Sequence, residues 1–281
     1  MTYPFEKLSY SLRQRLCRLF DPAETYAFQI AAPNFIGFQP IQKFQQVSDA
    51  RFLIYKNNIL QKLDSSSVEY STPTNSEAIP LYYVSNLLSM VKFTPDIKLS
   101  AVFGGFRLAP KHVYFYDCVL DETLIQSFVH AIINPIQHVH FYPCTFTSEN
   151  AAKMLCNSPA FKALEDFTLK EPMFPSATWW IEALGEAGCT SFKSFHIHFA
   201  SLSVLEIDKN IFLKFFKAQR NDFRMVITMS WQTKMHRAFK RVKKLLNEHF
   251  ENCDFADYSQ KAKGVEIYYG RQAWYYILRA D

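Results

Sequence analysis

The feature that most constrains the fold of this chain is a short pattern that recurs four times between residues 112 and 203. Each copy opens with two apolar residues that flank one other residue, and successive copies start 26, 28 and 28 residues apart. Alternation of this kind is the period of a strand with one buried face. The four openings are His112-Val113-Tyr114-Phe115, His138-Val139-His140-Phe141, Asp166-Phe167-Thr168-Leu169 and Ser194-Phe195-His196-Ile197.

A segment with helical spacing follows each predicted strand. It begins eight residues after the first apolar residue, at a residue type that starts helices well. These four positions are Asp121, Thr147, Pro175 and Ser203. One strand and one helix in so few residues cannot bury an apolar face alone, so the copies must stack. The pattern predicts an α/β fold with a leucine-rich-repeat-like βα solenoid, and an ordinary parallel α/β sheet is the alternative.

Less regular stretches flank the four copies. Before them, Phe52–Tyr55 has the composition of a strand, Tyr82–Val91 suits a helix that ends before Pro95, and Ile97–Leu99 suits an atypical first strand. After them, we expect a fifth strand at Phe223–Ile227, a basic amphipathic helix over residues 234–250 and a closing β-hairpin over residues 265–278.

Composition places the chain among globular proteins of the reduced cell interior. Of 281 residues, 49% are hydrophobic and 20% charged, which argues against long disorder. The formal charge of +5 is mild, so nucleic acid is an unlikely main partner. The N-terminus lacks a signal-peptide layout, no apolar run could span a bilayer, and six dispersed cysteines form no CxxC pair. These features predict a cytoplasmic or nuclear protein outside membranes.

The first 45 residues read as two helices separated by a break at Asp21-Pro22. Large apolar residues at fixed spacings around that break resemble the F-box motif. The residues that carry the likeness are Leu8, Leu12, Leu16, Phe20, Pro22 and Phe35. The chain departs from the motif at Ser9, where the family has Pro, at Ala32, where Cys is usual, and at Phe35, where Trp is usual. With the repeats and many aromatics, the whole chain is similar to the expanded nematode-type F-box proteins.

The resemblance implies a division of labour between two parts of the chain. Residues 1–45 would form an F-box-like helical module whose six apolar residues dock a Skp-type adaptor and, through it, a cullin complex. Residues 46–281 would form a repeat-containing domain that holds a protein substrate. The chain would then be a non-catalytic substrate-recognition subunit of a ubiquitin ligase. Two alternatives stay open: a free-standing repeat protein, and an RNA or acidic-ligand binder that uses Lys240–Lys244.

The strongest functional prediction concerns the outer face of the repeat strands. If the apolar pair of each copy points into the core, the residues between and beside the pair point away from it. Neighbouring strands lie about 4.8 Å apart, so these side chains should form one patch, which suits a partner-binding surface unless another layer covers it. The candidate partner-binding residues are His112, Tyr114, Tyr116, His138, His140, Tyr142, Lys170, His196 and His198.

Catalytic and metal chemistry find little support in the sequence. His138 and His140 share a strand face, as do His196 and His198, but zinc needs three or four converging ligands. Cys118 occupies the same position in its copy as Cys144, which favours small buried groups over nucleophiles. No hydrolase elbow, metalloprotease motif, kinase set or glycine-rich phosphate loop occurs. We therefore expect no catalytic residue, no metal and no cofactor.

Overall fold

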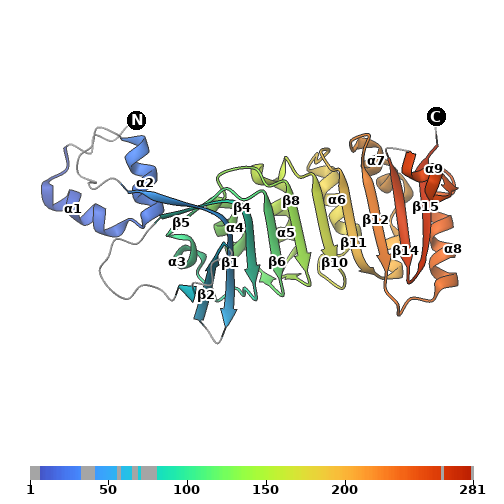
Figure 1. Cartoon of the computed structure of the whole chain (residues 1–281), viewed down its shortest axis with the longest axis horizontal. Coiled ribbons are helices and arrows are strands. Elements are labelled where there is room, and N and C mark those ends of the chain that lie inside the picture. Colours follow the sequence, from blue (N-terminus) through green and yellow to red (C-terminus); the bar gives the residue numbers. More distant parts are fainter. Residues whose placement is uncertain are drawn as a thin grey trace.

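The computed structural model describes residues 7–32, 42–55, 58–64, 69–70, 81–260 and 263–279. In this part, the chain forms an α/β fold around a 13-stranded, mostly parallel sheet (Figure 1). The helices are α1 (Tyr10–Leu19), α2 (Pro22–Ala31), α3 (Leu99–Phe103), α4 (Glu122–Ala131), α5 (Glu149–Asn157), α6 (Ala177–Glu186), α7 (Lys209–Ala218), α8 (Met235–Leu246) and α9 (Phe255–Gln260), with 3₁₀ turns η3 (Pro159–Phe161) and η4 (Leu202–Glu206).

Strand order in the sheet follows the chain closely. The order is β13-β15-β14-β12-β11-β10-β8-β6-β4-β1-β2-β3, with β5 beside β4, and every pair from β1 to β14 is parallel. The strands are β1 (Phe44–Tyr55), β2 (Asn58–Leu63), β3 (Glu69–Tyr70), β4 (Leu81–Val91), β5 (Phe106–Leu108), β6 (His112–Tyr116), β7 (Val119–Leu120), β8 (His138–Tyr142), β9 (Thr145–Phe146), β10 (Asp166–Lys170), β11 (Ser194–Ala200), β12 (Arg224–Met229), β13 (Phe250–Cys253), β14 (Gly264–Tyr269) and β15 (Gln272–Leu278).

The four predicted strands are confirmed as β6, β8, β10 and β11. They pair without stagger, so His112 lies beside His138, His138 beside Asp166, and Asp166 beside Ser194. Equivalent residues of the copies therefore form straight rows across the sheet.

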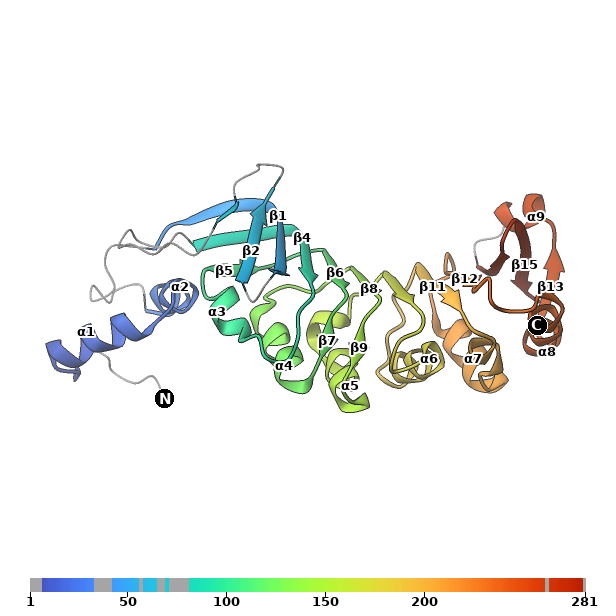
Figure 2. The ribbon, with the colours of Figure 1, turned by 90° about the horizontal axis from the view of Figure 1, so that it is seen from below.

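Helices α4 to α7 lie on one side of this sheet (Figure 2). The apolar pair of each copy faces them and is fully buried. Aromatic rings make the junction: Phe115 meets Phe128 of α4 with ring centroids 5.2 Å apart. Likewise, Phe195 meets Phe215 of α7 at 5.8 Å. Burial of these large rings is the main contribution to holding sheet and helices together.

The helix starts were predicted to within a few residues. Asp121 caps α4 as expected, because its carboxylate accepts the Leu124 N–H at 2.8 Å. The caps of α5 and α6 are Ser148 and Ser176, one residue later than predicted. Ser203 lies inside η4, and α7 begins only after a further cap at Asp208.

Two expectations before the repeats are wrong. Tyr82–Val91 forms strand β4 instead of a helix, and it pairs in parallel with β1 on one side and β6 on the other. Short apolar runs of this kind carry no period that separates strand from helix. Ile97–Leu99 is not the first strand either: Leu99 begins α3, and β4 pairs with β6.

The other flanking elements agree with the sequence. Phe52–Tyr55 falls within β1, Phe223–Ile227 overlaps β12, and β14 with β15 forms the closing hairpin. The basic helix is shorter than predicted, since α8 ends at Leu246 and Phe250 already belongs to β13. Among the described residues, no helix has the length and apolar character that a membrane span requires.

Candidate functional site

The candidate site is the sheet face opposite α4–α7, over strands β6, β8, β10 and β11. We call its twelve outward side chains the outer patch. All are half-buried except Thr168, which is buried, and no described element lies over them (Figure 2). The outer patch consists of His112, Tyr114, Tyr116, His138, His140, Tyr142, Asp166, Thr168, Lys170, Ser194, His196 and His198. The structure thus brings all nine predicted partner-binding residues onto one surface.

The first row of the outer patch is a line of polar side chains that contact one another at the starts of the strands. The rings of His112 and His138 stack with centroids 4.2 Å apart and planes 10° apart. His138 Nδ1 then contacts the Asp166 carboxylate. The Ser194 hydroxyl donates a hydrogen bond to the other oxygen of that carboxylate. This row is satisfied internally, so it orients the histidines rather than offering a free charge.

The second row centres on a nearly parallel stack. Tyr114 and His140 have ring centroids 4.3 Å apart and planes 1° apart. His140 Nδ1 is buried and has no hydrogen-bond partner in the described part of the chain. Burial, and next the nearby His138, lower the pKa of His140 to about 4. The ring is therefore neutral at physiological pH.

The third row lies at the ends of the strands and carries the largest rings. Tyr116 and Tyr142 stack at 5.5 Å, and Tyr142 lies 6.3 Å from His198. Burial, followed by the neighbouring tyrosine, raises the pKa of each tyrosine, so both hydroxyls stay protonated. Lys170 places its ammonium 4.7 Å from the centre of the Phe199 ring.

Burial makes the outer patch nearly neutral at physiological pH. It is the largest cause of a lowered pKa at four histidines, so these rings are uncharged acceptors and donors. They are His112, His140, His196 and His198. Aromatic rings with polar tips and few charges are typical of protein–protein contact surfaces.

The outer patch is closed at its C-terminal side by α9, which lies on the outer side of the sheet (Figure 2). Tyr258 of α9 covers Gly264, where an added Cβ would come within 2.3 Å of the Tyr258 ring. The guanidinium of Arg224 lies 4.0 Å from the centre of the same ring. The outer face of the sheet is therefore covered by α9 over β12 and β14, whereas over β6 to β11 it is not covered by this helix.

Sequence reasoning missed Phe199, at the edge of the outer patch. Strict alternation along β11 would point this residue inward, but the pairing of β11 with β12 shifts between Ile197 and Ala200. Phe199 adopts a positive φ of 57° and is 46% exposed. The signal in the sequence is a small residue, Ala200, at the buried position that follows. Such bulges redirect side chains.

Of the predicted adaptor-docking residues, Leu12 and Leu16 lie on α1, Leu8 precedes this helix and Phe20 follows it. Leu12 is 52% exposed, Leu8, Leu16 and Phe20 are half-buried, and Pro22 is the first residue of α2. Phe35 lies outside the described residues. Three further apolar side chains on these helices are strongly exposed: Tyr10, Leu19 and Ile30. The helix pair therefore presents an apolar surface that the rest of the described chain does not cover.

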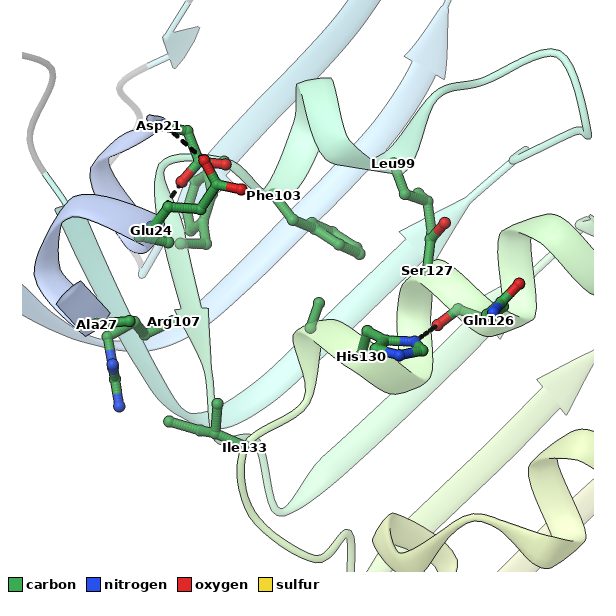
Figure 3. Close-up of a pocket in the computed structure, with 14 residues that line it drawn as sticks. Asp21, Glu24, Ala27, Leu99, Phe103, Arg107, Gln126, Ser127, His130 and Ile133 are labelled. Carbon is green, nitrogen blue, oxygen red and sulfur yellow. Dashed lines mark hydrogen bonds between the residues drawn. The ribbon is translucent and has the colours of Figure 1, made fainter. Parts of the chain in front are cut away.

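A cavity of about 520 Å³ lies where α2 meets α3, β5 and α4 (Figure 3). The backbone bond from Ala23 N–H to Gly104 O, 3.1 Å long, attaches α2 here. Its polar groups already have partners: Asp21 and Glu24 bond each other's backbone, and His130 Nδ1 lies 2.8 Å from Gln126 O. Arg107 lies over the Tyr26 ring. No catalytic set is assembled from these side chains.

The metal-binding side chains and the cysteine thiols of the described residues also form no recognisable site. Within the described ranges, no group of three or more His, Cys, Asp or Glu side chains is placed to hold a metal ion. Cys118 and Cys144 are buried in the same row, as predicted. The interaction between the two thiols raises the pKa of Cys118 and lowers that of Cys144, and burial opposes ionisation of both. Both thiols are buried, as expected for small core groups.

Comparison of the chain with family models, with curated proteins and with solved structures gives no match.

Proposed function

We propose that this chain is a non-catalytic interaction adaptor that holds a protein partner on the outer patch. The observation that carries the proposal is the outer patch itself: twelve aligned side chains, rich in Tyr and His, that no described element covers. Half-buried aromatic side chains lose little conformational freedom on binding and offer both apolar area and hydrogen bonds.

The same observation supports a leucine-rich-repeat-like array for the region after the N-terminal helices. Three strands in a row, β6, β8 and β10, pair in register, and each is followed by a helix on the same face. In such arrays each repeat contacts mainly its neighbours, and the strand face is a common binding surface.

We further propose that α1 and α2 dock a Skp-type adaptor, which would make the chain the substrate-recognition subunit of a cullin-based ubiquitin ligase. Support comes from exposed apolar residues on the short helix α1: Tyr10 is 69%, Leu12 is 52% and Leu19 is 71% exposed. An apolar surface of this kind on a small helical module marks an interaction site. Ubiquitin transfer would then occur on other subunits.

A binding experiment with a purified Skp-type adaptor tests the docking proposal. The full chain should bind the adaptor, and Leu12→Asp/Leu16→Asp should abolish binding because it places two carboxylates in the apolar contact. The matched control, Tyr114→Ala/Tyr142→Ala, should bind the adaptor like the wild type. If the wild type shows no binding, the ubiquitin-ligase role is wrong, and a free-standing interaction protein is left.

The outer patch is tested by quantitative affinity capture from cells, comparing three forms of the chain. Proteins held by the outer patch should be lost from Tyr114→Ala/Tyr142→Ala but retained by Leu12→Asp/Leu16→Asp. If both variants retain every partner of the wild type, the outer patch is not a binding surface.

A further inference from the structure

The positive charge of the chain is concentrated in α8 and its flanks. Residues 234–250 contain six Lys or Arg residues and one acidic residue, Glu248. The whole chain has 31 Lys and Arg and 26 Asp and Glu, so the remaining sequence has 25 of each and no net charge. One helical segment therefore accounts for the entire formal charge of +5.

Part of this charge lines a groove between α8 and η4, which we call the α8 groove. The groove has a volume of about 670 Å³ and is lined by Leu202, Arg237, Lys240, Arg241 and Lys244. Arg241 is paired with Glu206 at 2.9 Å. In the described part of the chain, the side chains of Arg237, Lys240 and Lys244 are exposed and make no ion pair or hydrogen bond.

The stability of α8 explains only part of this arrangement: Lys243 and Lys244 lie in the last turn, where the helix dipole favours cations, but the cations of the first turn gain nothing from it. The N-cap residue of α8, Lys234, makes no side-chain capping hydrogen bond, and the first turn of the helix has no acidic residue. Cations there face the positive end of the helix dipole, which is unfavourable for the helix and increases the attraction for anions. Four buried residues attach α8 to the core instead: Ala238, Val242, Leu245 and Leu246.

We propose that the α8 groove binds an acidic segment of a protein partner. From Arg237 to Lys244 the helix rises about 10 Å, which matches about three residues of an extended peptide. Carboxylates or phosphates on the segment would meet the three unpaired cations, and an apolar neighbour would contact Leu202. The rest of the chain has equal numbers of basic and acidic residues, so it adds no net attraction for a long nucleic acid, which favours a short acidic segment. This inference does not depend on the outer patch or on the N-terminal helices.

Fluorescence anisotropy of the full chain with labelled octapeptides tests the proposal. The probes are a peptide with four glutamates and two leucines, its phosphoserine analogue and its glutamine analogue. The two anionic peptides should bind, more weakly as salt increases, and the glutamine peptide should not. Arg237→Gln/Lys240→Gln/Lys244→Gln should weaken binding roughly tenfold or more, because three charge contacts are lost.

The matched control is Lys43→Gln/Lys98→Gln/Lys153→Gln, which removes the same charge at exposed positions outside α8 and should bind the anionic peptides like the wild type. Three results would overturn the proposal. The first is equal binding of the anionic peptides by both triple variants. The second is no binding of either anionic peptide by the wild type at peptide concentrations up to about 1 mM. The third is tighter binding of an eight-nucleotide oligouridylate than of both anionic peptides, which would assign the groove to nucleic acid.

Discussion

Substitution of two adjacent residues of β8, His140 and Phe141, compares how much each face of the sheet contributes to stability. Phe141 is fully buried on the inner face, and its ring lies 5.1 Å from Phe115, 5.5 Å from Phe146 and 5.7 Å from Trp180. Phe141→Ala removes these contacts and leaves a cavity that rigid neighbours cannot fill. We expect it to lower the free energy of unfolding by about 3–5 kcal/mol.

His140→Ala, one position earlier, should cost much less. The change removes the stack on Tyr114, which contributes about 0.5–1.5 kcal/mol. It also removes a buried Nδ1 without a hydrogen-bond partner in the described chain, and leaving such a group unpaired costs about 1–3 kcal/mol. The two effects oppose each other, so the net change should stay within about 1 kcal/mol of zero.

Urea denaturation followed by far-UV circular dichroism measures both variants against the wild type. The difference in unfolding free energy between the two variants should be about 2–6 kcal/mol, with the dependence of the unfolding free energy on urea unchanged. In thermal melts, each kcal/mol corresponds to about 2–4 °C for a chain of this size. Equal losses from His140→Ala and Phe141→Ala would refute the reasoning, since they would mean that the outer patch is covered and packed like the core.

Other predictions concern single residues. The pKa of His140 lies at about 4 instead of 6.5, so between these values the unfolded state binds a proton that the folded state does not. The free energy of unfolding should therefore fall as the pH drops from 6.5 towards 4. Urea titrations at several pH values should show a shallower fall for His140→Ala than for the wild type. Gly264→Ala should cost about 1–3 kcal/mol, because its Cβ would lie 2.3 Å from the Tyr258 ring and 2.9 Å from Tyr276 O. Gly185→Ala in α6, with 3.6 Å to Phe215, should be neutral or stabilising in the same melts. Glu171→Ala should lower the free energy of unfolding by about 1–3 kcal/mol, because the buried carboxylate accepts hydrogen bonds from Ser201 N and Oγ at 3.0 Å. Glu171→Gln should lower it less in the same denaturation assays.

The two faces of the repeat strands could be predicted because a period of two residues states directly which side chains share a face. Phe115 and Phe141 therefore appeared as core residues, and Tyr114 and His140 as outer residues, from spacing alone. Strand β4 could not be predicted in the same way, since its apolar run has no clear period. Its identity depends on pairing with β1 and β6, which is information from distant parts of the chain.

The residues that share the outer patch could be predicted from the sequence, but the edges of the patch could not. Register follows from the repeat, so the rows of the outer patch could be written down in advance. The bulge that exposes Phe199 and the helix α9 that covers Gly264 both depend on contacts between elements. The unpaired state of Arg237, Lys240 and Lys244 also required the structure, because sequence shows charge but not partners.

The strict register of β6, β8, β10 and β11 has a consequence for how such a surface can change over time. Each rung contributes three outer side chains, and the residues that hold the fold lie on the opposite face. Substitutions on strands that are not neighbours, such as β6 and β11, should therefore be nearly additive in their effect on stability. Substitutions on adjacent strands should be coupled, because their side chains stack on each other. If the outer patch binds a partner as proposed, partner choice can change through its outer side chains, and related chains can acquire new specificities while keeping an unchanged interior.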